Sequence, residues 1–206
     1  RAEVADAIFI STGRRELTMF EGIGARVYHM PNPVEASVEC MDNSQRTDLP
    51  IDLLFCSNST NFTSRLEMIG RFKDALTSEM NFKTYGSFGE APVWGRDYDR
   101  ALASTKMGLN LSRGTPIKYY SSDRLTQITG NGLVTLIDEK TGYRDFFTDK
   151  EMVFYKNVSD LTEKIYKITR DDKLRRSIGK RGKKKYLKYF NSNLVAEFII
   201  NKTFEF

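Results

Sequence analysis

The sequence contains little histidine, cysteine or tryptophan, and it has no long apolar run. His29 is the only histidine, which excludes metal centres built from several histidines and proton relays that need two imidazoles. Beside the turn Pro31-Asn32-Pro33, we expect a structural role for His29 rather than that of a lone base. Cys40 and Cys56 lack metal-ligand spacing, which is typical of free thiols in a reducing compartment. No stretch approaches the about 18 apolar residues of a membrane span, and we see no secretory signal, so we expect a cytoplasmic protein.

The start of the chain and one polar stretch suggest how the protein is divided. The sequence enters the apolar run at residues 7–10 almost at once. Because a domain rarely begins so abruptly, we expect an N-terminal domain to be largely missing from this sequence. Residues 35–50 are polar and without periodicity, which indicates a linker or hinge. We therefore predict that residues 1–49 are the end of an N-terminal domain with its linker, and that residues 50–206 form a second domain.

Positive charge is concentrated in one segment. The formal net charge is +5, but Arg170 to Lys188 alone contains ten basic and two acidic residues. Such a run is most often the solvated face of a helix, and contact with a membrane surface or a nucleic acid is the minority alternative. We expect no nucleic-acid partner and leave a peripheral contact with the inner membrane face open.

Strand-like and helical patterns alternate along the chain. Ile51–Cys56 is an apolar run typical of a buried strand, and residues 66–80 then place apolar side chains at helical spacing. Further strand-like runs follow at residues 82–85, 107–111, 133–137 and 152–155. Alternation of this kind predicts right-handed βαβ units, and therefore an α/β fold with a Rossmann-like parallel sheet flanked by helices.

Residues 108–138 are the most informative segment. They predict a strand, a loop with cations, a short helix, a glycine turn and a second strand. This order places Asn110, Arg113, Lys118 and Arg124 around the carboxyl end of a strand and the first turn of the next helix. Helix N-terminal amides and cations both favour phosphate there, and no run of nearby acids neutralises these cations. We interpret the segment as part of a nucleotide-diphosphate site.

Other candidate residues lie near this segment or precede it. Tyr120 and Ser122, between Lys118 and Arg124, supply hydroxyl groups to the predicted site. Gly86 begins a Gly-Ser-Phe-Gly stretch that fits neither common phosphate-loop motif, so a tight turn and close approach to a ligand remain equally open. Trp94 either stacks on a base or packs in the core.

The triplet Asp97-Tyr98-Asp99 has a D-x-D form that can hold a divalent metal. Asp97 stands where a helix N-cap is expected, and Arg96 and Arg100 are adjacent. Capping with a solvated charge pair is the interpretation we prefer. We therefore predict no metal site and no cofactor.

From residue 110 onward, several elements follow the order of a known family. They are Asn110, Arg124-Leu125-Thr126-Gln127, Gly132, the run at 133–137, Asp145-Phe146-Phe147, the run at 152–155, and the helical stretch 160–190. Over about residues 51–190 this order resembles the C-terminal, nucleotide-sugar-binding domain of GT-B glycosyltransferases, which contain two Rossmann domains. It is most similar to the group related to spore-maturation-protein glycosyltransferases. Residues 2–34 resemble the end of the N-terminal domain of that fold.

The resemblance implies a glycosyltransferase that binds a nucleotide-diphospho-sugar and transfers the sugar, without a metal, to an acceptor not identified by the sequence. It adds Gln127 to the donor-binding residues. Retaining members carry glutamates at the positions of Gln127 and Tyr119, and neither residue here offers a carboxylate, so no catalytic residue is assigned. A non-catalytic nucleotide-sugar-binding module and a nucleic-acid or membrane protein acting through its basic surface are the alternatives.

Overall fold

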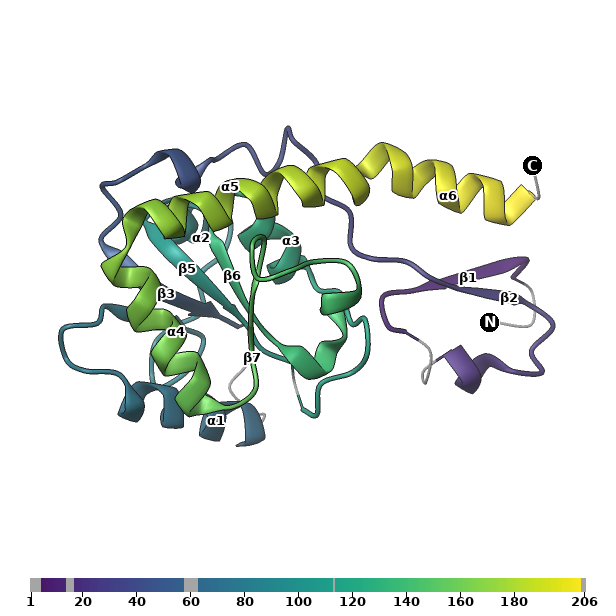
Figure 1. The fold of residues 1–206 in the computed structure, drawn as a ribbon. Coiled ribbons are helices and arrows are strands. Elements are labelled where there is room, and N and C mark those ends of the chain that lie inside the picture. The colour runs from purple at the N-terminus through teal and green to yellow at the C-terminus, as the bar shows by residue number, and fades with distance from the viewer. Residues whose placement is uncertain (1–4, 14–16, 58–62, 113, 205–206) are drawn as a thin grey trace.

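The computed structural model describes residues 5–13, 17–57, 63–112 and 114–204, which contain two parallel sheets (Figure 1). The small sheet pairs β1 (Ala7–Ile10) with β2 (Arg26–His29). The larger sheet has the order β4-β3-β5-β6-β7, and all its strand pairs are parallel. Its strands are β3 (Ile51–Cys56), β4 (Phe82–Tyr85), β5 (Thr105–Asn110), β6 (Val134–Asp138) and β7 (Val153–Tyr155). The α/β prediction with a parallel sheet is confirmed.

Helices cover both faces of the larger sheet. Leu53 and Phe55 in β3 pack in one cluster with Ile69 of α1, whereas Leu54 packs in another with Ile128 of α3. This division follows from the period of two along a strand, which sends successive side chains to opposite faces. The helices are α1 (Thr63–Ala75), α2 (Arg96–Ala103), α3 (Asp123–Gly130), α4 (Val158–Arg170), α5 (Asp172–Tyr189) and α6 (Ser192–Phe204), with short 3-10 turns at Leu17–Phe20, Asn43–Gln45, Glu139–Thr141 and Tyr143–Asp145.

The strand order creates a switch point between β3 and β5. The chain leaves β3, forms β4 on one side of it, and then crosses to form β5 on the other side. Connections on the two sides cover opposite faces of the sheet, so the carboxyl ends of β3 and β5 border a crevice that neither connection fills. In open α/β sheets ligands bind at this point.

The polar stretch 35–50 is packed rather than free. Asn43 in its 3-10 turn is fully buried, and its Nδ2 donates to the carbonyls of Leu102 at 2.7 Å and Thr105 at 2.8 Å. Arg175 of α5 donates to the carbonyl of Asn43 at 3.0 Å and also to that of Arg46. The stretch predicted as a linker or hinge is therefore an ordered connection, whose polar groups bond to α2, β5 and α5.

The basic helix α5 is therefore partly structural. The side chain of Arg175 is 1% exposed, and Arg176 donates to the carbonyl of Ser44 at 2.9 Å. The exposed cations of α5 are Lys173, Lys180, Arg181, Lys184 and Lys188. Helix α6 continues along the same side of the molecule and lies beside β1 (Figure 1), where the ring of Phe198 meets those of Phe9 and Tyr28 edge-on. In the part of the chain that is described, no helix combines the length and apolarity needed to cross a membrane.

Candidate functional site

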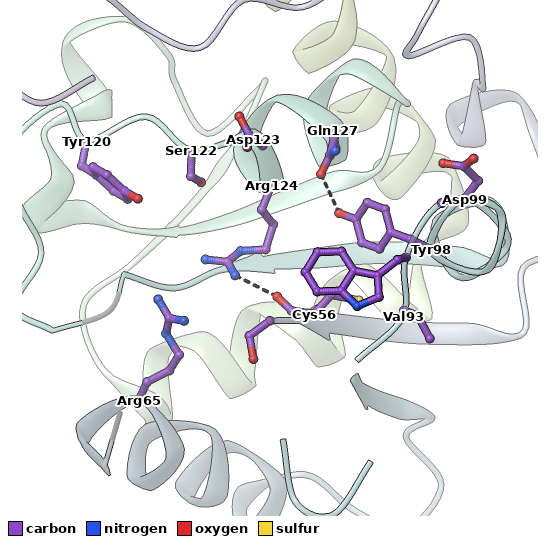
Figure 2. Close-up of a pocket in the computed structure, with 13 residues that line it drawn as sticks. Cys56, Arg65, Val93, Tyr98, Asp99, Tyr120, Ser122, Asp123, Arg124 and Gln127 are labelled. Carbon is purple, nitrogen blue, oxygen red and sulfur yellow. Dashed lines mark hydrogen bonds between the residues drawn. The ribbon is translucent and has the colours of Figure 1, made fainter. Parts of the chain in front are cut away.

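A pocket of about 420 Å³ lies at the switch point of the larger sheet (Figure 2). Three segments supply most of its lining: the end of β3, the residues that lead into α2, and the residues from 120 to the middle of α3. Helix α1 contributes Arg65. The lining residues are Cys56, Ser57, Arg65, Val93, Trp94, Gly95, Tyr98, Asp99, Tyr120, Ser122, Asp123, Arg124 and Gln127. Five of the residues predicted from sequence thus meet in one pocket: Trp94, Tyr120, Ser122, Arg124 and Gln127.

Arg124 spans the pocket from the first turn of α3. Its Nη1 donates to the carbonyl of Cys56 at 2.8 Å and its Nη2 to that of Leu111 at 2.6 Å. Its guanidinium carbon lies 4.9 Å from the ring centroid of Phe55. Burial lowers the pKa of Arg124, its Nε is buried without a hydrogen-bond partner, and no ion pair joins it to a carboxylate among the described residues. A buried guanidinium that has no carboxylate partner favours an anionic ligand.

A second guanidinium comes from α1. Arg65 is 7% exposed, its Nε donates to the carbonyl of Ser112 at 3.2 Å, and its guanidinium carbon lies 5.9 Å from the ring of Phe55. Figure 2 shows both guanidinium groups turned toward the same region of the pocket. Sequence reasoning missed Arg65, although it stands in the first turn of the helix that follows β3. That position, one turn beyond the strand at the switch point, is the signal that could have identified it.

The N-terminus of α3 adds main-chain donors to the two cations. Ser122 is the N-cap residue, and its Oγ accepts from the amide of Leu125 at 3.3 Å. The same Oγ donates to Oδ1 of Asn110 at 3.1 Å, and Asn110 is 6% exposed at the end of β5. Asn110 therefore does not line the pocket but holds the cap of the helix that does. The amides of the first turn and the helix dipole favour a negative group here.

The opposite wall is formed by the uncharged Tyr98, Gln127, Cys56 and Trp94, together with the exposed carboxylate of Asp99. The hydroxyl of Tyr98 donates to Oε1 of Gln127 at 2.8 Å, so the fold brings α2 and α3 together through a side-chain pair. Burial raises the pKa of Tyr98 and raises the pKa of the Cys56 thiol to about 12. Both groups are therefore neutral at pH 7, and Cys56 is not a thiolate nucleophile. Trp94 lies at this pocket with 64% of its surface exposed, which excludes the alternative that it packs in the core.

Several predicted site residues lie elsewhere. Lys118 does not line the pocket. Its ammonium lies 3.6 Å from Asp145 and 4.6 Å from the ring centroid of Tyr119. No run of acids lies near Lys118 in the sequence, but the fold brings the distant Asp145 to it. Arg113 falls outside the described residues.

The glycine stretch and the D-x-D triplet also have structural explanations. Gly86 has a φ of 69°, and a Cβ there would lie 1.9 Å from the carbonyl oxygen of Ser57, so the close approach is to main chain beside the pocket. Gly95, not Asp97, is the N-cap of α2, so the predicted cap is wrong. The predicted charge pair is confirmed, because Asp97 accepts from Arg100 at 2.9 Å.

Comparison with known families decides how the chain is classified. Residues 65–201 match the family described as glycosyl transferase-like, a span that contains the pocket's Arg65, Tyr98, Arg124 and Gln127. The chain belongs to the glycosyl transferase-like family. No curated protein matches it.

Solved structures with the same fold are distant in sequence. The chain is 12% identical to S. aureus TarM with a TM-score of 0.73, and the similarity covers 97% of this chain and 43% of TarM. The chain is 10% identical to Anabaena Alr3699/HepE in complex with UDP, with a TM-score of 0.70, and the similarity covers 98% of this chain and 64% of HepE. The chain is 14% identical to the pneumococcal O-GlcNAc transferase GtfA in complex with UDP and GlcNAc, with a TM-score of 0.64. The similarity covers 97% of this chain and 45% of GtfA.

These similarities establish the fold of this family member as that of GT-B glycosyltransferases. The chain spans less than two thirds of the length of each of these proteins.

Proposed function

We propose that this chain is the donor-binding part of a glycosyltransferase and that a nucleotide-diphospho-sugar binds in the switch-point pocket. The observation that carries the proposal is the pair of buried guanidinium groups, Arg65 and Arg124, beside the N-terminus of α3. Two cations and a helix N-terminus match the charge of a diphosphate. Residues 1–49 are proposed to be the end of an N-terminal domain, and residues 50–206 the donor-binding domain.

The same groups give the pocket a chemical role. When the glycosidic bond to the diphosphate breaks, negative charge grows on the leaving group, and fixed donors at that position stabilise the transition state. Arg124, Arg65 and the amides at the start of α3 are proposed to supply this stabilisation without a metal ion. UDP is the first nucleotide to test, since the HepE and GtfA structures are complexes with UDP. Trp94 is proposed to stack on the base.

The groups that activate the acceptor are proposed to lie in the part of the protein that precedes this chain. Gln127 accepts from Tyr98, and the hydroxyl of Tyr119 bonds to Asp145. Neither residue supplies a carboxylate to the pocket, so the chain alone is expected to transfer little or no sugar. Assignment to the spore-maturation-like group rests on the order of residues 110–190 and is part of the proposal, as is the cytoplasmic location.

A peripheral membrane contact is proposed for the outer face of α5. Lys173, Lys180, Arg181, Lys184 and Lys188 are exposed there, and none forms an ion pair with a carboxylate in the described part of the chain. Anionic lipid attracts such a face. Replacing Lys180, Lys184 and Lys188 by glutamine should abolish sedimentation with anionic vesicles, whereas replacing Lys140 and Lys150 should not. Equal loss with both sets, or no sedimentation by the parent protein, would reject this contact.

Calorimetric titration of the chain with UDP, GDP and dTDP tests the donor site. We expect one nucleotide diphosphate to bind at one site, and Arg124→Ala to weaken it. The matched control is Arg144→Ala, because Arg144 pairs with Asp149 at 3.0 Å and does not line the pocket. Absence of binding by all three nucleotides, or equal losses in the two variants, would reject the proposed site.

A further inference from the structure

The loop that leads into α3 is held from outside the pocket by the N-terminal segment. This loop carries Tyr120 and Ser122, which line the pocket, and it ends at the N-cap of α3. Residues just after β1, the last residue of β2 and Asn32 bond to the same loop. The small sheet and the proposed donor site therefore share one loop.

Two of the contacts come from the residues after β1. The amide of Gly13 donates to the carbonyl of Lys118 at 2.7 Å, and the amide of Ser121 donates to the carbonyl of Ser11 at 2.7 Å. These bonds run in opposite directions between the two segments. They fix the main chain on both sides of Tyr119 and Tyr120.

The last residue of β2, His29, and Asn32 after it supply the remaining contacts. Nε2 of His29 lies 3.0 Å from the carbonyl oxygen of Tyr119. The amide of Asn32 donates to Oγ of Ser121 at 2.8 Å, and its Nδ2 donates to Asp123 at 2.5 Å. Asn32 thus reaches both the loop and the first residue of α3.

Tyr119 has an uncommon backbone conformation that these contacts support. Its φ is 58°, in the left-handed region that non-glycine residues rarely adopt. Its amide donates to the carbonyl of Thr141 at 2.8 Å, and its carbonyl meets His29. With Tyr119 turned toward His29 and the ring of Phe146, its neighbour Tyr120 lines the pocket.

Gly13 packs closely against Lys118 and Tyr119 of the loop. A Cβ at Gly13 would lie 2.7 Å from Cδ2 of Tyr119 and 2.8 Å from the carbonyl oxygen of Lys118. Both distances are shorter than a side chain tolerates, and the second is to main chain. Any larger residue at position 13 must push the loop away from the small sheet.

We infer that Gly13, His29 and Asn32 are positioning residues for the donor, because they fix the loop that presents Tyr120, Ser122 and the start of α3. The inference rests on the proposed function for the identity of the ligand. Coupling of this kind is reciprocal, so a shift of the small sheet changes donor affinity and bound donor resists that shift.

Substitutions at Gly13 and His29 test the inference through UDP affinity. We expect Gly13→Val and His29→Leu each to weaken UDP binding about tenfold at a temperature where circular dichroism shows the proteins folded. The matched control is Gly114→Val, because a Cβ at Gly114 meets no atom within 4 Å. His29→Gln, which keeps an N–H donor, should recover much of the affinity. If Gly13→Val does not fold, the two His29 variants provide the same test.

Hydrogen exchange without ligand separates this inference from the proposed function. The Tyr119 and Ser121 amides should exchange at least tenfold faster in Gly13→Val and His29→Leu, with the β3 amides unchanged. If the parent protein does not bind UDP, the proposed function fails and the exchange rates alone decide the inference. Parent-like exchange at Ser121 in both variants would overturn it, as would parent-like UDP affinity where the parent binds.

Discussion

Arg124, in the first turn of α3, donates from Nη1 to the carbonyl of Cys56, the last residue of β3, at 2.8 Å. This bond joins the two elements that border the switch point, although they are far apart in the sequence. It also fixes the guanidinium beside the ring of Phe55. The pocket therefore has a cation whose position is set by main chain rather than by a carboxylate.

Replacing Arg124 should weaken donor binding. We expect Arg124→Ala to weaken UDP binding by about 1–3 kcal/mol, the range for a lost charge-assisted hydrogen bond. The UDP affinity of Arg124→Lys should lie between those of Arg124→Ala and the parent, because lysine keeps the positive charge but not the planar guanidinium. Isothermal titration measures the difference, and a lysine variant weaker than the alanine variant would contradict the charge argument.

Lys118 should contribute little to binding. Its ammonium is outside the pocket and 3.6 Å from Asp145. We therefore expect the UDP dissociation constant of Lys118→Ala to remain within about twofold of the parent value, since a solvated ion pair contributes about 0–1 kcal/mol. A loss comparable to that of Arg124→Ala would show that the phosphate site extends beyond the pocket.

Trp94 should report nucleotide binding directly. As the only tryptophan, exposed and lining the pocket, it is the sole source of indole fluorescence. We expect UDP to quench this emission, and Trp94→Ala to weaken binding by about 1–3 kcal/mol if the base stacks on the ring. Unchanged emission at UDP concentrations that calorimetry shows to be saturating would rule out stacking.

The stability of the fold should fall between pH 7.5 and 5.5 because of His29. Burial lowers the pKa of His29 below its usual 6.5, and the contact with the Tyr119 carbonyl opposes this shift. The unfolded chain therefore binds more protons below about pH 6.5, so the free energy of unfolding decreases as the pH falls through that value.

His29 is the only histidine, so no other histidine titrates between pH 7.5 and 5.5. The nearby ionisable groups, Lys118 and Asp145, have pKa values shifted away from the window, upward for the lysine and downward for the aspartate. Urea unfolding at the two pH values should show the decrease in the parent and not in His29→Gln. An equal decrease in both proteins would assign the effect to other groups.

Arg175 should be essential for stability rather than for binding. Its side chain is 1% exposed and donates to Asp172 and to the carbonyls of Asn43 and Arg46. Arg175→Met should lower the free energy of unfolding by about 3 kcal/mol, because the buried guanidinium's hydrogen bonds to the carbonyls of Asn43 and Arg46 and its ion pair with Asp172 are lost together. Arg181→Met, at an exposed position of the same helix, should change it by less than about 0.5 kcal/mol. Equal urea midpoints would contradict this account.

Local patterns in the sequence were sufficient for the fold class, and the sequence predicted five of the thirteen residues that line the pocket. The apolar run in β3 and the helical spacing after it depend only on neighbours in the chain, and the βαβ rule then gives a parallel sheet. Ser122 and Arg124 could be predicted because a strand, a loop and a helix start follow one another directly. Arg65 was missed, although it stands in the first turn of the helix after β3, because the sequence does not show that β3 borders the switch point, which only the strand order reveals.

What the sequence determined by itself was the order of strands and helices, and with it the carboxyl edge where a ligand could bind. The tertiary structure alone decided which cations are available there. Arg124 and Lys118 look equivalent in the sequence, but the fold places Arg124 over Phe55 against main-chain carbonyls and brings Asp145 to Lys118. The polar stretch at 35–50 follows the same rule, since its partners, among them Leu102, Thr105 and Arg175, are distant in the sequence. Charge pairing and burial depend on residues that are distant in the chain, so no local pattern encodes them.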